Sequence, residues 1–195
     1  MERRHFIALT GAAALAPALP AAALTQASAT TLVNALIVDI NRVISSSKSE
    51  NAMMKDFERI FAKYSDTSYI SAYAMGADGR RASTAQKRAF STAFQGYVAR
   101  KYGRRFREFI GGRLEVKSVK KVKSWYEVDT TAFLRGESPF TVTFHVSDRT
   151  GQDLFFNMFI EGINLLLTER TEVGALLDRN GGNIDAMIRD LQTTS

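Results

Sequence analysis

Few side chains in this sequence are suited to acid–base or nucleophilic chemistry, which depends on a tuned His, Cys or carboxylate pair. The chain has no cysteine and two histidines, of which His5 lies in an N-terminal apolar segment. His145 alternates with Phe144, so it belongs to the opposite face of a strand, as surface and cross-strand histidines do. Glu161 beside Gly162 is a candidate buried acid, although a carboxylate at a strand end more often faces solvent or caps the next helix.

Patterns that bind metals or cofactors are also missing from the sequence. There is no glycine loop that would cradle a phosphate, no zinc-ligand spacing and no calcium loop. Without cysteine, neither disulfides nor thiolate metal sites can form. We therefore expect no catalytic residue, no metal, no cofactor and no enzymatic activity.

Positive charge is the main polar feature, with a formal net charge of +6. The basic side chains form two clusters, Arg104-Arg105-Arg107 and Lys117, Lys120, Lys121, Lys123. A solvated surface is the simplest interpretation. Nucleic acid would need aromatic side chains on the charged face, and Phe106 and Phe109 follow the apolar pattern instead, so we expect no nucleic acid partner. Anionic lipid headgroups or an acidic partner fit better, with four candidate docking residues: Arg104, Arg105, Lys120 and Lys121.

The N-terminus has the pattern of an export signal. Residues 3–5 are Arg-Arg-His, an Ala- and Leu-rich run follows as far as Leu24, and Ala27-Ser28-Ala29 offers the small-x-small pattern of signal peptidase. Two prolines interrupt the run, which is Ala-dominated and therefore a poor membrane-spanning helix. We predict that residues 1–29 are a cleaved signal, on the Sec or the twin-arginine route, and that residues 30–195 form a single domain.

Hydrophobic periodicity predicts helices before and after a group of strands in the sequence. Apolar residues at three- and four-residue steps predict helices over 31–47, 51–64 and 66–75. A Ser83-x-x-Gln86 capping box predicts a long helix that reaches Gly111-Gly112. Helical periodicity returns beyond Gly162 and again over the last residues, 184–191.

Between the helices the apolar period changes to two. Strands are predicted over 125–134, 140–146 and 154–160, with a first strand near 114–119. Short turn clusters join them, so the strands form an antiparallel meander of about four. Helices, then a sheet, then helices indicate a single α+β domain.

Three segments together resemble a known family: "FERIFAKYSDTSYISAYAMG", "RASTAQKRAFSTAFQGYVARKYGRRF" and "MFIEGINLLLTERTEVGALLDRNGGNIDAMIRDL". The sequence resembles the MlaC family of periplasmic phospholipid shuttles, also called toluene-tolerance or auxiliary transport proteins, over about residues 31–191. Thr84, where the family often has Pro, and Asn183, which lengthens a Gly-x-Asp motif, depart from the family pattern.

The resemblance implies helices packed over a highly twisted antiparallel sheet, with a deep apolar cavity that holds acyl chains while the headgroup stays outside. It implies a periplasmic carrier that maintains outer-membrane lipid asymmetry. Its partners would be an outer-membrane lipoprotein-porin complex and an inner-membrane ABC transporter complex with a lipid-binding ring. The candidate lipid-binding residues on the predicted apolar stripes are Phe90, Phe94, Tyr97, Val98, Tyr102, Val128, Val142, Phe144, Phe156 and Met158.

Three alternatives remain open from the sequence. An exported small-ligand enzyme would use Glu161 or an Asp as base in an apolar pocket, and an acid with a raised pKa beside His145 would favour it. A carrier of the same fold for a hopanoid or another lipid is the second alternative. A structural envelope protein with a filled core and no cavity is the third.

Overall fold

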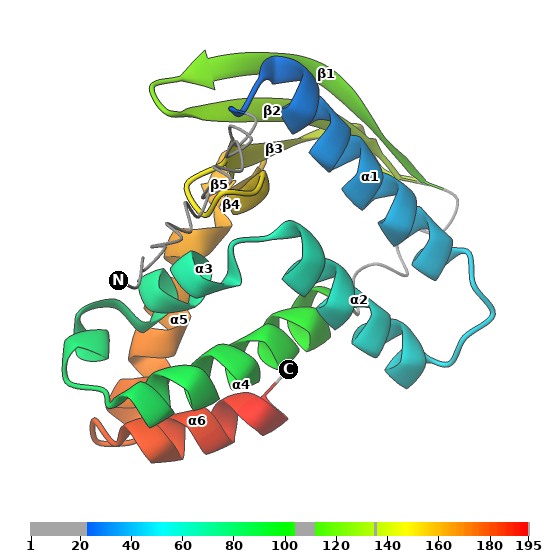
Figure 1. Cartoon of the computed structure of the whole chain (residues 1–195). Coiled ribbons are helices and arrows are strands. Elements are labelled where there is room, and N and C mark those ends of the chain that lie inside the picture. The colour runs from blue at the N-terminus through cyan, green and yellow to red at the C-terminus, as the bar shows by residue number, and fades with distance from the viewer. Residues whose placement is uncertain (1–22, 104–111, 135, 195) are drawn as a thin grey trace, which may run out of the picture.

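Along the chain, helices precede and follow the strands of one antiparallel sheet (Figure 1). The computed structural model describes residues 23–103, 112–134 and 136–194. The described helices are α1 Gln26–Ile44, α2 Glu50–Tyr64, α3 Thr67–Met75, the 3-10 helix η1 Gly76–Arg80, α4 Thr84–Gly103, α5 Leu165–Arg179 and α6 Ile184–Thr193. The strands are β1 Arg113–Val122, β2 Trp125–Phe133, β3 Phe140–Ser147, β4 Leu154–Ile160 and β5 Ile163–Asn164.

Polar caps fix where the helices begin. Ser83 and Gln86 form the predicted capping box: the Gln86 N–H donates to Ser83 Oγ (3.1 Å), and the Ser83 N–H donates to Gln86 Oε1 (2.9 Å). Helix α1 begins five residues earlier than predicted, because Thr25 and Ser28 form a second capping box. The part of the long helix predicted beyond Gly103, residues 104–111, lies outside the described residues.

The five strands follow one another in the order β1-β2-β3-β4-β5, and all neighbours are antiparallel. The prediction of an α+β domain with an antiparallel meander is confirmed, with a two-residue fifth strand in addition. Glu161 and Gly162 both have positive φ angles, 49° and 79°, which suits a two-residue hairpin turn. The chain therefore reverses at once after β4 and enters α5.

One face of the sheet is buried against helices. On β2 the alternate residues Val128, Thr130 and Ala132 have no exposed surface. The Thr130 hydroxyl is satisfied inside the sheet, where it donates to the Val142 carbonyl oxygen (2.7 Å). Helix α1 lies along this face and packs on β1, β2 and β3 (Figure 1).

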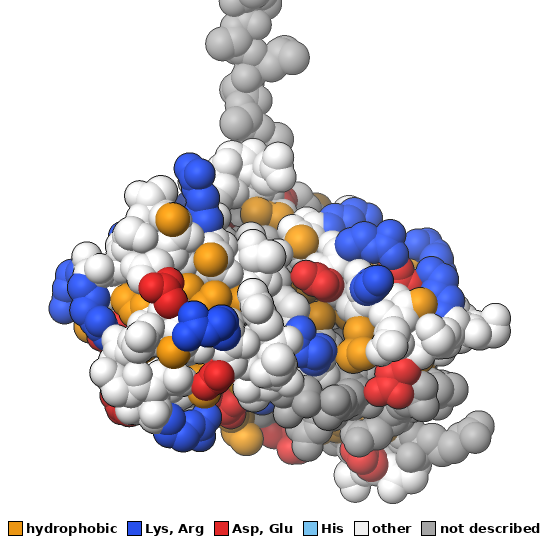
Figure 2. All heavy atoms as spheres, turned by 90° about the horizontal axis from the view of Figure 1, so that it is seen from below, with side chains coloured by type: hydrophobic (Ala, Val, Ile, Leu, Met, Phe, Trp, Pro, Cys, Tyr) orange, Lys and Arg blue, Asp and Glu red, His pale blue; other side chains and the backbone are white. Residues whose placement is uncertain are grey.

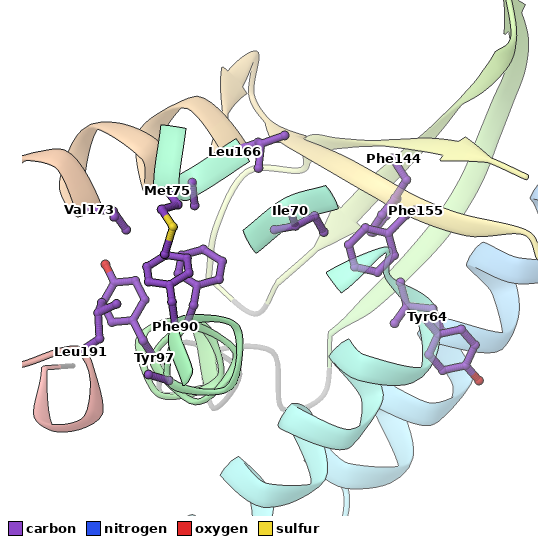
Figure 3. Packing of buried hydrophobic residues seen from close by; sticks show 14 of the residues in the cluster. Tyr64, Ile70, Met75, Phe90, Tyr97, Phe144, Phe155, Leu166, Val173 and Leu191 are labelled. Atoms are coloured by element: carbon purple, nitrogen blue, oxygen red, sulfur yellow. The ribbon is translucent and has the colours of Figure 1, made fainter. Parts of the chain in front are cut away.

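Away from the sheet, the N-terminal half of α4 packs among α3, α5 and α6. Phe90 stacks on Phe94 with ring centroids 5.5 Å apart, and Met187 and Leu191 of α6 are fully buried. Figure 3 shows Phe90, Tyr97, Met75, Val173 and Leu191 gathered on one side, while Phe144 and Phe155 lie on the other. We call this part, around Phe90, Tyr97, Val173, Met187 and Leu191, the packed end. Tyr97, Val173 and Leu191 also border a second, smaller pocket of about 220 Å³.

Helix α1 is the one described helix whose length and composition would allow it to cross a membrane; it lies near the N-terminus, where signal sequences satisfy the same criteria. In the structure its apolar side is in contact with the sheet, and Ala29 and Val33 are fully buried. The chain before it is also fixed, because the Leu24 N–H donates to Asp148 Oδ2 (3.0 Å).

Candidate functional site

An apolar cavity of about 390 Å³ lies between the inner face of the sheet and helices α1, α2, α4 and α5. Its lining is aliphatic or aromatic apart from Glu137, Asn157, Glu161 and Glu169. A methylene group fills a volume close to the share of one liquid water molecule, roughly 30 Å³, so the cavity has room for on the order of a dozen methylenes. This size and lining are typical of a site for an apolar ligand.

Seven of the ten candidate residues line this cavity: Phe94, Val98, Tyr102, Val142, Phe144, Phe156 and Met158. They come from the C-terminal half of α4 and from β3 and β4, whose facing positions Phe144 and Met158 are paired in the sheet. The structure thus brings the apolar stripe of α4 and alternating residues of β3 and β4 together around one cavity.

Phe90, Tyr97 and Val128 do not line it, contrary to expectation. Phe90 belongs to the packed end, where only 1 % of its surface is exposed. The Tyr97 hydroxyl donates to Glu172 Oε2 of α5 (2.6 Å), and Val128 is buried in the middle of β2. The apolar stripe of α4 is longer than the cavity, so its first turns serve packing instead.

Much of the wall comes from residues that were not predicted to face a ligand. Helices α1 and α2 contribute Leu36, Ile40, Phe57, Ile60 and Phe61. Their three- and four-residue spacing predicts an amphipathic helix, but that signal is the same for a helix that meets a filled core. Further lining residues lie at strand ends and at the start of α5: Leu114, Leu134, Phe140, Ile160, Leu165 and Leu166.

Phe156 is set apart by an irregularity in β4. His145 pairs with Asn157 and Val146 with Phe155, so Phe156 is the extra residue of a β-bulge. It borders the cavity, yet its ring makes edge-on contacts with Tyr69 at 5.6 Å and Trp125 at 6.0 Å. Without the bulge, strict alternation of side chains along β4 would have placed the Phe156 ring on one face of the sheet only.

The buried acid at the cavity wall is Glu169, one turn into α5. Its Oε1 accepts hydrogen bonds from Lys101 Nζ (2.8 Å) and from the Tyr102 hydroxyl (2.5 Å). Its Oε2 is buried and has no hydrogen-bond partner among the described residues. Lys101 also donates to Glu172 Oε2 at 2.6 Å, so Lys101 and Tyr102 of α4 are tied to α5 at the cavity border.

Hydrogen bonds and burial determine the protonation states of Glu172 and Tyr97, two residues of this cluster that do not line the cavity. Burial acts to raise the pKa of Glu172, but hydrogen bonds from Lys101 and Tyr97 outweigh it and hold the pKa below its ordinary value. Burial and the neighbouring Glu172 raise the pKa of Tyr97. Near neutral pH, Glu172 is therefore a carboxylate and Tyr97 a neutral donor.

His145 is separate from the cavity. Its Nε2 lies 3.4 Å from Glu127 Oε1, and its ring packs against Phe159 on the outer face of the sheet. Burial lowers the pKa of His145.

Glu161 is exposed in the β4–β5 turn at the border of the cavity. His145 therefore pairs with an acid outside the cavity, while the donors to Glu169 at the cavity wall are Lys101 and Tyr102. Among the described residues no group of three or more His, Asp or Glu is placed to hold a metal ion.

Of the candidate docking residues, Lys120 and Lys121 are exposed near the β1–β2 hairpin. Arg104 and Arg105 lie outside the described residues. Figure 2 shows Lys and Arg side chains in separate groups on one face of the molecule, with Asp and Glu between them. On that face the charge is mixed.

Comparisons with known proteins agree with this architecture. The model of a family described as MlaC protein matches residues 30–193. A solved structure of a phospholipid-binding protein from Ralstonia solanacearum, in complex with a phospholipid, is similar with a TM-score of 0.72 and 16 % sequence identity. The similarity covers 85 % of this chain and 96 % of that one. No curated protein matches the sequence.

Proposed function

We propose that this chain, which belongs to the MlaC family, is a periplasmic carrier that holds a phospholipid by its acyl chains. It would receive and deliver its cargo at an outer-membrane lipoprotein-porin complex and an inner-membrane ABC transporter complex with a lipid-binding ring. The observation that carries the proposal is the apolar cavity between the sheet and α1, α2, α4 and α5. The fold it shares with a phospholipid-bound protein supports the same cargo class.

The energetics of lipid transfer explain why a carrier of this kind is needed. Moving a phospholipid with about thirty methylenes from a bilayer into water costs on the order of 25 kcal/mol, at about 0.8 kcal/mol each. A cavity that shelters about a dozen of these methylenes removes about 10 kcal/mol of this cost. Exchange between two apolar environments then needs no bond to be made or broken, which fits a site without an acid–histidine pair.

Mass spectrometry of lipids extracted from the purified protein tests the proposal. We expect phospholipid in a near-stoichiometric amount, and transfer of labelled phospholipid from donor to acceptor vesicles when the protein is added. A hopanoid in the extract would change the cargo and keep the carrier. Protein that carries no lipid and transfers none would be a structural protein or an enzyme, and the proposal would be wrong.

We also propose that the protein is exported with removal of its N-terminal signal, and the structure bears on where. Cleavage after Ala29 would remove Thr25 and Ser28, which cap α1, and Leu24, which is bonded to Asp148. The sequence Ala21-Ala22-Ala23 offers the same small-x-small pattern six residues earlier and would keep these contacts.

N-terminal sequencing of the exported protein therefore has two informative outcomes. A start at Thr30 supports the first site, and a start at Leu24 supports retention of the helix cap. With the cap retained, the protein is expected to be more stable by about 1 kcal/mol, the usual contribution of an N-cap. A chain that keeps Met1 in the periplasmic fraction would contradict cleavage at either site.

A further inference from the structure

The two edges of the sheet differ in what occupies them. At the β4 edge the chain supplies its own partners: Ser65 forms a parallel bridge with Phe155, and the Asp66 N–H donates to the Phe155 carbonyl oxygen (2.8 Å). Strand β5 pairs with Phe159 and Ile160 further along the same edge. Much of that edge is therefore covered by the molecule itself.

Strand β1, at the opposite edge, lacks such partners (Figure 1). Its strand neighbour is β2, and among the described residues no other element makes a hydrogen bond to its backbone. None of its ten residues is buried. Alternate N–H and C=O groups of an edge strand point away from its neighbour, so β1 presents a row of unpaired donors and acceptors.

The apolar side chains of β1 are arranged to meet an alternating sequence. Leu114, Val116 and Val119 contact the hydrophobic core from the inner face of the sheet, yet each stays only half-buried. Apolar residues of an added strand would lie beside them and cover their remaining surface, as cross-strand neighbours do. On this face the edge therefore favours a segment whose alternate residues are apolar.

Charge determines the other half of the alternation. Residues 113–123 contain five basic residues and one acidic residue, so they carry a net charge of +4. The acid, Glu115, is already bonded to Arg113 and Lys117. The three lysines that follow are exposed and form no ion pair within the described part of the chain: Lys120, Lys121 and Lys123. This row of unpaired ammonium groups attracts carboxylates and repels basic segments.

We propose that residues 118–122 of β1 bind an extended, acidic segment of a partner protein, which adds to the sheet as a further strand. The register of β1 shifts between Val116 and Ser118, so the regular part of the edge beyond this bulge is the part that carries the unpaired lysines. Backbone hydrogen bonds supply affinity, and the alternation of apolar and acidic side chains supplies specificity. The inference concerns docking and does not depend on the content of the cavity.

A peptide of four Val-Glu repeats, blocked at both ends, is the probe at neutral pH and low salt. We expect it to bind the wild-type protein and to slow hydrogen exchange about tenfold or more at alternate amides of residues 118–122, because strand pairing protects the amides that it uses. A peptide of four Val-Lys repeats is the charge control and should neither bind nor protect β1. Binding of the acidic peptide without protection of β1 would overturn the proposal.

Methylated peptides separate strand pairing from charge attraction. Two versions of the Val-Glu peptide are methylated on one or the other set of alternate amide nitrogens, so each keeps every carboxylate and loses the donors of one edge. We expect at least one version to bind about tenfold more weakly, since it cannot form the backbone hydrogen bonds. If both bind as tightly as the parent peptide, the contact is electrostatic only and no strand is added.

Charge reversal on the protein tests the lysines. Lys120→Glu with Lys121→Glu should weaken binding of the Val-Glu peptide about tenfold, and both side chains are exposed, so the fold should be retained. Lys87→Glu with Arg88→Glu makes the same change on α4 and should leave peptide binding intact. Equal losses in the two variants would assign the attraction to net charge and contradict a site at β1.

Two further outcomes distinguish this inference from the others. If the peptide does not protect β1, while Lys120→Glu with Lys121→Glu slows transfer to anionic vesicles, the lysines contact a membrane surface and the strand proposal is wrong. Lipid content of the purified protein is measured separately. A protein that binds the peptide at β1 but carries no lipid would keep this docking site and contradict only the carrier function.

Discussion

The two halves of helix α4 meet different surroundings. Its first turns, with Phe90, are enclosed in the packed end by α3, α5 and α6, while its later turns, with Val98 and Tyr102, border a cavity of about 390 Å³. Phe94, between them, has no surface exposed to solvent and still lines the cavity. Burial from water therefore does not distinguish a side chain that packs from one that is available to a ligand.

Both regions combine apolar packing with polar links. In the packed end Phe90 stacks on Phe94, and the Tyr97 hydroxyl donates to Glu172. The wall formed by α1 and α2 contains an apolar cluster, and Asp39 accepts hydrogen bonds from Lys63 (2.8 Å) and from the Tyr64 hydroxyl (2.6 Å).

The largest expected effect is on stability at the packed end. Phe90→Ala should lower the free energy of unfolding by about 3–5 kcal/mol, because it opens a hole in a filled core. Val98→Ala on the same helix should cost only about 1 kcal/mol, since that side chain already borders empty volume. Urea denaturation of both lipid-free variants measures the difference. A cost for Val98→Ala of about 2 kcal/mol or more, as for truncation in a filled core, would mean that the two halves of α4 are packed alike.

Filling the cavity should affect cargo more than folding. Val98→Trp and Met158→Arg place bulk or charge in the space an acyl chain would occupy, and we expect lipid content to fall at least tenfold while the protein still purifies folded. Val38→Trp is the matched control, since Val38 is 54 % exposed on α1. Phosphate analysis of the purified proteins is sufficient. Normal lipid content in both cavity variants would remove the cavity from the function.

The polar fastening of α1 to α2 should weaken in acid. Hydrogen bonds from Lys63 and Tyr64 lower the pKa of Asp39 from 3.8 to about 2. Its contribution to stability is therefore present above pH 3.8 and is lost as the pH falls through 2. Because Lys63 and Arg42 are exposed, we expect Asp39→Asn to cost only about 1 kcal/mol at pH 7.

The pH dependence is the diagnostic part of that experiment. The difference between Asp39→Asn and wild type should shrink towards zero at pH 2, as followed by urea unfolding. Asp78→Asn, which breaks an exposed ion pair with Arg81, should change stability by less than about 0.5 kcal/mol at any pH. A constant cost of Asp39→Asn from pH 7 to pH 2 would argue against a charge-based link.

The smallest expected effect concerns docking. Lys120→Glu with Lys121→Glu should slow lipid transfer to anionic vesicles about threefold at low salt and less at high salt, because exposed charges are screened beyond about 10 Å at 0.1 M. Lys87→Glu with Arg88→Glu, near the start of α4, makes the same charge change elsewhere on the surface. Equal slowing by both pairs would point to net charge instead of a docking surface.

Most of the fold was predictable from local patterns. The change of apolar period from about 3.6 to 2 and back separates the helices from the strands, and the Ser83–Gln86 box fixes the start of α4 to the residue. Each of these signals depends on neighbours in the sequence. The two-residue strand β5 was missed because it is too short to show a period.

The candidate site was predictable only in part, because a cavity forms where side chains leave space unfilled, and this does not show in the sequence pattern. Phe90 and Phe94 occupy one stripe and have the same side chain, yet only Phe94 meets the cavity. Glu169 was not expected at the wall, since an acid within a helical period usually faces water. In the sequence, the one indication that a buried carboxylate would find a partner was Lys101, near the end of α4.

Strand β1 is an edge of the sheet, ten residues long, with one neighbour, β2. A long edge strand offers unpaired amide and carbonyl groups along which a second copy of the chain can add a strand. Lysines 117, 120, 121 and 123 lie along this edge and at its hairpin. When two such edges approach, these ammonium groups repel each other. Lys120 and Lys121, which we propose for docking, would thus also oppose self-association, and replacing the four lysines with neutral residues would favour aggregation through β1.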